Sequence, residues 1–95
     1  MQNLTLEIFV WDIKRESDNI KKHGIDFETA RLAFFDRERT ILSAKEIKGE
    51  KRFFCIGNVD GKIISVRFVL RGSHIRIFGA SKYRKEERIY EKSKR

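Results

Sequence analysis

The sequence predicts an α+β domain: an antiparallel β-sheet meander with two N-terminal helices and a C-terminal helix. Within residues 3–10 and 39–80, apolar and polar residues alternate in several segments, which is the two-residue period of a strand. Residues 12–36 and 81–95 lose this alternation and are rich in helix formers. With no proline and no linker-like composition, residues 1–95 are expected to form a single domain.

The N-terminal segment is predicted to be a strand followed by a helix. The strand is expected over residues 3–10, with these apolar residues on one face: Leu4, Leu6, Ile8 and Val10. Asp12 or Ser17 is expected to cap the first helix at its N-terminus, since both side chains accept hydrogen bonds from free amides. Gly24 is expected to end that helix, because glycine suits the left-handed position after the last turn.

A second helix is predicted in the stretch "IDFETARLAFFD". Asp26 is a suitable N-cap, and Phe27, Ala30 and Phe34 recur at helical spacing and should face the core. The two helices would then form a tight pair joined at residues 23–25.

The remaining strands are predicted at residues 39–44, 52–58, 62–70 and 74–80. Asp60-Gly61 and residues 71–73 are expected to be the turns of two hairpins. On the third of these strands, the inward residues are expected to be Ile64, Val66, Phe68 and Leu70, opposite Ser65, Arg67 and Val69. On the last strand, Ile75 and Ile77 are expected to lie opposite His74, Arg76 and Phe78.

The charge of the chain points to a polyanionic partner. Twenty-two Lys and Arg residues against fourteen Asp and Glu leave a net charge of +8 and a sequence pI near 9.9. Such an excess favours nucleic acid or an acidic protein. No apolar run is long enough for a membrane span or a signal peptide, and the lone Cys55 excludes an intrachain disulfide. A cytoplasmic location is therefore expected.

A row of arginines is predicted on one face of the late strands. Arg67 and Arg76 lie opposite the apolar face of neighbouring strands, and Arg52 on the preceding strand is expected to join them. A guanidinium group can grip a phosphate through two N–H groups, so the row forms a possible phosphate platform. The alternative is an ordinary solvated sheet face, where Lys and Arg are common.

A second basic cluster lies at the end of the first helix. It contains Lys21, Lys22 and His23, and an imidazole can both accept and donate a proton near neutral pH. The alternative is structural, because cations near a helix C-terminus interact well with the helix dipole and its last carbonyls. The sequence has no phosphate-binding glycine loop, catalytic triad or metal-ligand spacing, so any catalysis is predicted to need no metal or cofactor.

The order of motifs resembles the BrnT family of type II toxins. The N-terminal motifs that carry the resemblance are Trp11-Asp12, Asn19, Lys22-His23-Gly24, Phe27, Ala30 and Phe34 to Asp36. The later ones are Arg52, Ile56-Gly57, Val66, Arg71-Gly72 and the run "IRIFGASKYRKEER". The resemblance covers nearly the whole chain.

The resemblance implies a RelE-like ribonuclease fold and a toxin that cleaves RNA and inhibits translation. Its partner would be a DNA-binding, BrnA-like antitoxin of the ribbon-helix-helix type, held in a toxin–antitoxin hetero-oligomer. By carry-over, the catalytic candidates are Lys22, His23, Arg52, Arg67 and Arg76. The RNA-binding candidates are Lys21, Lys82, Arg84, Lys85 and Arg88.

The sequence departs from the family at the end of the last strand. Many members carry an Arg after Ser-Ala, whereas this chain has Gly79-Ala80-Ser81 followed by Lys82. Either Lys82 supplies that charge from the next position, or activity is reduced. The alternative to a ribonuclease is a non-catalytic basic module that binds nucleic acid or an acidic protein.

Overall fold

The computed structural model describes residues 8–82 of the chain. In chain order, the elements are β1 (Phe9–Val10), α1 (Ile13–His23), α2 (Phe27–Ala30), the 3-10 helix η2 (Arg31–Phe35), β2 (Thr40–Ile47), β3 (Glu50–Val59), β4 (Lys62–Arg71) and β5 (His74–Ser81). The predicted α+β class is confirmed. The predicted C-terminal helix and residues 3–7 of the predicted first strand lie outside the described residues.

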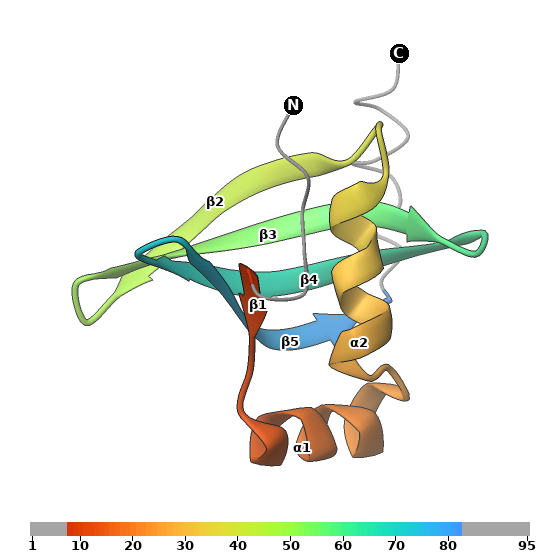
Figure 1. Cartoon of the computed structure of the whole chain (residues 1–95), viewed down its shortest axis with the longest axis horizontal. Coiled ribbons are helices and arrows are strands. Elements are labelled where there is room, and N and C mark those ends of the chain that lie inside the picture. The colour runs from red at the N-terminus through yellow and green to blue at the C-terminus, as the bar shows by residue number, and fades with distance from the viewer. Residues whose placement is uncertain (1–7, 83–95) are drawn as a thin grey trace.

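The sheet is mixed, and the prediction of a purely antiparallel meander is wrong at one edge. The strand order is β1-β5-β4-β3-β2, and β2 to β5 form the expected antiparallel meander (Figure 1). In contrast, β1 pairs in parallel with β5, Phe9 opposite Ile75 and Val10 opposite Arg76. The helical segment reverses the chain direction between β1 and β2. Three hairpin reversals follow along the meander, so β5 runs in the same direction as β1.

The ends of the first helix follow from their sequence. Asp12 caps α1, with its Oδ1 accepting a hydrogen bond of 2.8 Å from the amide of Lys14. At the other end Gly24 has φ 71°, and its N–H donates to the carbonyl of Ile20 at 2.8 Å. Both predicted boundaries are confirmed, with Asp12 rather than Ser17 as the cap.

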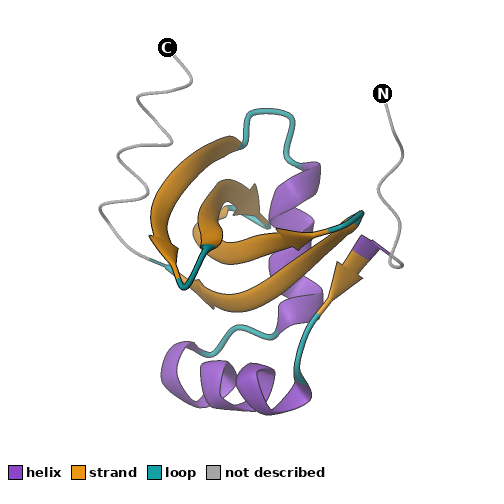
Figure 2. Ribbon diagram, turned by 90° about the vertical axis from the view of Figure 1, so that its left-hand side faces the viewer, coloured by secondary structure: helices purple, strands orange, loops and turns teal. Residues whose placement is uncertain are grey.

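The second helix packs on one face of the sheet (Figure 2). It begins after Asp26, as predicted, and tightens into η2 after one α-helical turn. The predicted inward residues Phe27, Ala30 and Phe34 are buried. The ring of Phe34 lies 5.0 Å from that of Phe68, centroid to centroid, so β4 and η2 share the main core.

The predicted inward faces are wrong at two places. Phe9, expected on the outward face of the first strand, is 5% exposed and packs on Phe34 at 5.2 Å. On β4, Leu70 is 54% exposed while Val69 is 3% exposed. Because β4 is the central strand, its second face is also partly covered, and simple alternation fails there. Among residues 8–82, no helix has the length and apolar character needed to cross a membrane.

The face of the sheet turned away from α2 and η2 has its own small apolar cluster. Ile56 and Ile63 are its buried members, and Leu42 and Phe54 pack against them. Register fixes this face, because Phe54 lies opposite Arg67. We call it the arginine face, because Arg52, Arg67 and Arg76 lie on it.

Candidate active site

One side of α1 lines a cavity of about 240 Å³ against the sheet. The cavity is lined by residues of α1, β4 and β5: Arg15, Asp18, Asn19, Lys22, His23, Arg67 and Phe78. The α1 residues recur three, four and seven positions apart, which places them along one side of a helix. The helix C-terminus and the arginine face therefore meet at one place.

Asn19 fixes α1 to the sheet beside this cavity. Its Nδ2 donates to the carbonyls of Ile25 and Ala80, both at 2.9 Å, and its Oδ1 accepts from the amide of Ala80 at 3.1 Å. Within the described residues, β1 pairs only with the start of β5, so Ala80 lies on a part of the strand that β1 does not reach. A helix side chain thus satisfies both backbone groups of Ala80, and it does so while 6% exposed.

Glu16 fixes the same helix to the chain on either side of it. Its two carboxylate oxygens accept hydrogen bonds from the indole Nε1 of Trp11 at 3.2 Å and from the amide of Phe27 at 2.9 Å. The indole also packs edge-on against the Phe27 ring at 6.1 Å. Trp11 thus packs against the main core and holds α1 beside it.

The predicted arginine row is present on the arginine face. Arg52 and Arg76 flank Val69 on neighbouring strands, since both lie directly opposite it in the register. Arg67 is two residues before Val69 on β4 and so shares its face. The Cζ of Arg52 lies 4.7 Å from the centroid of the Phe78 ring, within the range of a cation–π contact.

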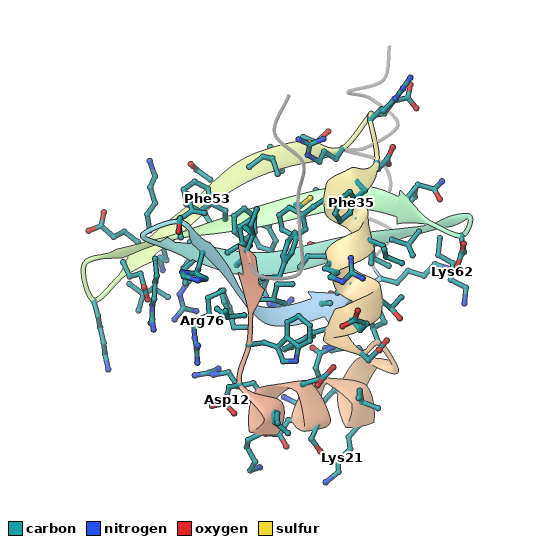
Figure 3. The ribbon with its side chains drawn as sticks, in the orientation of Figure 1. Asp12, Lys21, Phe35, Phe53, Lys62 and Arg76 are labelled. Carbon is teal, nitrogen blue, oxygen red and sulfur yellow. The ribbon has the colours of Figure 1, made fainter. Side chains whose placement is uncertain are left out.

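The predicted catalytic residues therefore form two adjoining groups. Lys22, His23 and Arg67 line the cavity itself. Arg52 reaches it through Phe78, which lines the cavity and lies under its guanidinium group. Arg76 lies one row further along the sheet, toward its left-hand end in Figure 3.

The predicted RNA-binding residues are more dispersed. Lys21 projects from the outer side of α1, away from the sheet (Figure 3). Lys82 is exposed and lines a second cavity of about 240 Å³, where it is joined by His23 and Lys62. Three further candidates lie outside the described residues: Arg84, Lys85 and Arg88.

The position at which the chain departs from the family is buried. Ser81 is fully buried opposite Ser65, which is also fully buried, and neither hydroxyl has a hydrogen-bond partner within the described part of the chain. The next residue, Lys82, faces the second cavity and not the one lined by Arg67. His23 lies between the two cavities and contributes to both.

The sequence analysis did not select Arg15 or Asp18. Arg15 precedes Lys22 by seven residues, two helical turns, so helical spacing from Lys22 could have identified it. Asp18 adds a carboxylate to the cavity, and its oxygens also lie 3.1 and 3.2 Å from the Nζ of Lys14. Phe78 was predicted only to lie opposite Ile75 and Ile77 on the last strand, with no role in a site.

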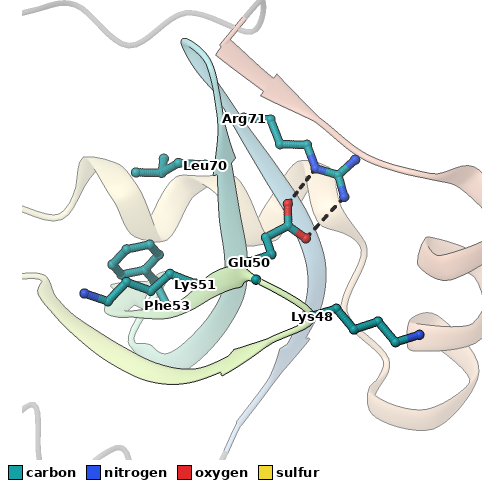
Figure 4. A pocket seen from close by; sticks show the side chains of 7 residues that line it. Lys48, Glu50, Lys51, Phe53, Leu70 and Arg71 are labelled. Atoms are coloured by element: carbon teal, nitrogen blue, oxygen red, sulfur yellow. Dashed lines mark hydrogen bonds and ion pairs between the residues drawn. The ribbon is translucent and has the colours of Figure 1, made fainter.

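An ion pair between Arg71 and Glu50 lies at the far end of the arginine row. Arg71 donates to the two carboxylate oxygens of Glu50 at 2.8 and 3.3 Å (Figure 4). This hydrogen bonding lowers the pKa of Glu50, and the positive charges of Arg71, Arg52 and Arg76 lower it further. The same bond raises the pKa of Arg71. The pair borders an open hollow of about 660 Å³ on the sheet, away from α1.

The described residues suit phosphate chemistry better than thiol chemistry. Cys55 is fully buried, and this burial raises the pKa of its thiol to about 12. Across residues 8–82, no group of three or more His, Cys, Asp and Glu side chains is placed to hold a metal ion. The cavity instead gathers an imidazole, an ammonium and guanidinium groups.

The chain matches a protein-family model over residues 11–87. That family is described as the ribonuclease toxin BrnT of type II toxin–antitoxin systems. A search of curated proteins found no match. The matched range extends from Trp11, just before the N-cap of α1, beyond the end of β5, so it includes every residue that lines the cavity.

Proposed function

The chain belongs to the BrnT family of ribonuclease toxins of type II toxin–antitoxin systems, and we propose that it cuts RNA in the cavity between α1 and β4. In this proposal it is an endoribonuclease that needs no metal and inhibits translation by cleaving RNA in the cytoplasm. The observation that carries the proposal is the convergence of Lys22, His23 and Arg67 on one cavity from two distant segments.

These three side chains complement a phosphodiester. Negative charge grows on the phosphate oxygens during cleavage, and fixed N–H donors stabilise that charge more than they stabilise the substrate. The guanidinium of Arg67 supplies such donors in a planar fork. The imidazole of His23 and the ammonium of Lys22 supply groups that can exchange protons with the substrate.

The nucleophile in this proposal is the RNA itself. The 2′-hydroxyl oxygen attacks the adjacent phosphorus, and the bond from phosphorus to the 5′-oxygen of the next nucleotide breaks. His23 or Lys22 performs one of the two proton transfers, taking the proton from the 2′-hydroxyl or giving one to the leaving 5′-oxygen, and solvent water performs the other. The products are a 2′,3′-cyclic phosphate and a 5′-hydroxyl end.

The other basic residues would hold the RNA on either side of the cut. Arg52 would join Arg67 at the cleaved phosphate, Arg76 continues the positive face along the sheet, and Lys82 lies in the second cavity on the other side of His23. We propose that the same surface is covered by the antitoxin, a DNA-binding, BrnA-like protein of the ribbon-helix-helix type. The net charge of +8 supports an acidic contact surface on that partner.

The first experiment is cleavage of RNA by the purified protein with and without a chelator. We expect cleavage to continue in excess EDTA, and its loss would contradict the metal-free scheme. His23→Gln and Lys22→Gln should each lower kcat by about 100-fold, the usual contribution of a positioned proton-transfer group.

Lys48→Gln is the matched control for these variants. It removes a lysine charge at the β2–β3 turn, where Lys48 lines the hollow shown in Figure 4 and not the cavity beside α1. We expect its kcat to stay within about twofold of wild type. RNA binding without cleavage by the wild type would instead support a non-catalytic basic module.

A further inference from the structure

The last strand carries a bulge beside the cavity. On β4, Arg67 lies opposite Gly79, whereas the next residue, Phe68, lies opposite Ile77. One residue of β5, Phe78, therefore has no counterpart on β4. An extra residue of this kind bends a strand locally and re-aims its side chains.

The bulge turns Phe78 and Gly79, which are successive residues of β5, toward the arginine face. Arg67 and Val69 share that face, and their partners on β5 are Gly79 and Arg76. Residues three apart lie on opposite faces of a regular strand, so the bulge is what places both partners on one face. Phe78 reaches it as well, since its ring lines the same cavity as Arg67.

Phe78 and Gly79 each lie against one arginine. The guanidinium of Arg52 sits over the Phe78 ring at 4.7 Å, and its Nε is buried with no hydrogen-bond partner among residues 8–82. The guanidinium of Arg67 lies where a side chain of residue 79 would be. A Cβ on Gly79 would be 2.3 Å from its Nη2 and 2.7 Å from its Cζ and Nε.

We propose that Phe78 and Gly79 are positioning residues that fix the two guanidinium groups in the orientation needed to bind one phosphate. Phe78 provides a flat apolar surface for Arg52, and Gly79 leaves the space that Arg67 occupies. A free arginine side chain has many rotamers, and holding it in place before the substrate arrives removes that ordering cost from the reaction. This inference rests on the proposed function, since it concerns the same phosphate site.

The first test replaces Gly79 by alanine. The added methyl group displaces the far end of a flexible side chain and not backbone, so the fold should persist with Tm within a few degrees of wild type. We expect Gly79→Ala to lower kcat by about 10-fold or more with a smaller change in KM, because the displaced donors act mainly on the transition state.

The matched comparison uses the background Arg67→Lys. Lysine has no planar group over residue 79, so adding Gly79→Ala there should change kcat by less than about twofold. Wild-type kcat in Gly79→Ala, or an equal loss in both backgrounds, would overturn the proposal while leaving ribonuclease activity of the wild type intact.

The second test needs no change at Gly79. Phe78→Leu keeps the apolar bulk but removes the flat ring, and it should lower kcat by about 10-fold, whereas Phe78→Tyr should stay within about twofold of wild type. Equal activity of the two variants would overturn the role given to the ring.

A readout independent of cleavage separates this proposal from the proposed function. In nuclear magnetic resonance spectra of the wild type, the Nε–H signal of Arg67 should be resolved, and Gly79→Ala should move it toward the position of a free arginine. An unmoved signal would contradict the proposed fixed position of the Arg67 guanidinium against Gly79, whether or not the protein cleaves RNA.

Discussion

At the scale of single residues, Asn19 joins α1 to the sheet through both ends of its amide. Three hydrogen bonds at 2.9 to 3.1 Å link it to the turn after the helix and to the outer edge of β5. The partners are the carbonyl of Ile25 and both backbone groups of Ala80. Lys22 and His23 follow within one turn, so the position of the cavity wall depends on this amide.

Replacing Asn19 by leucine should destabilise the protein. The substitution leaves buried backbone groups unpaired, and we expect the free energy of unfolding to fall by about 2–3 kcal/mol, as measured by urea denaturation. Ser17→Ala on the exposed side of α1 is the control and should change it by less than about 0.5 kcal/mol. Equal stability of the two variants would contradict the role of the amide.

Cys55 should be unreactive in the folded protein. Its thiol pKa is raised from 9.0 to about 12 by burial, so at pH 8 the thiolate is about a thousandfold rarer than in the unfolded chain. Because the neutral form is favoured in the fold, this contribution to stability is present below pH 9 and is lost as the pH rises toward 12. Labelling with Ellman's reagent at pH 8 should be at least about 100-fold slower than in denaturant, and equal rates would contradict the burial.

At the scale of elements, the end of α1 is both a helix terminus and the location of the proposed reactive groups. Gly24 terminates the helix in a left-handed conformation, and His23 immediately before it faces the cavity. The two interpretations of the basic cluster, a helix C-terminus and a reactive group, are therefore compatible. Because the chain turns sharply after His23, this residue lines both cavities.

Gly24→Ala should weaken this helix end without filling any space. A Cβ there would meet nothing within 4 Å, so the expected cost comes from the φ of 71° alone and is about 1 kcal/mol. Gly24→Asn should cost less, since asparagine adopts this conformation more readily. Thermal unfolding monitored by circular dichroism checks the order glycine, asparagine, alanine, and alanine at wild-type stability would contradict it.

The elements that depend on local chemistry were predictable from the sequence. Asp12, Gly24 and Asp26 act through their own side chain or backbone, so their helix boundaries were correct. The hairpin at Asp60-Gly61 is of the same kind. In contrast, the parallel pairing of β1 involves residues far apart in the chain, and no local pattern encodes it.

The candidate site was predictable in part. Alternation correctly placed Arg67 and Arg76 on one face, and it did so because that face is continuous across β4 and β5. The bulge at Phe78 depends on the pairing of β4 with β5, which alternation within one strand does not encode. The contacts of Arg67 with Gly79 and of Arg52 with Phe78 therefore could not be inferred from the sequence. The wrong prediction that Leu70 is inward has a similar origin, because burial on a central strand depends on which residues cover each face of the sheet.

At the scale of the whole molecule, the fold divides its two tasks between the two faces of one sheet. The face toward α2 and η2 holds the main apolar core, including Phe34, Phe68 and Ile77. The other face carries the arginines and meets α1 at the cavity. In the proposed function, the net charge of +8 draws RNA to the molecule, and α1 supplies Lys22 and His23 to react with it.

The most direct test of this account uses an RNA oligonucleotide cut by the wild-type protein at a single mapped bond. Replacing the nucleotide on the 5′ side of that bond by its 2′-deoxy form removes the proposed nucleophile and leaves the phosphate in place. We predict that cleavage at this bond stops, and that the all-RNA substrate yields a 2′,3′-cyclic phosphate by mass spectrometry. Continued cleavage of the 2′-deoxy substrate at the same bond would contradict the account.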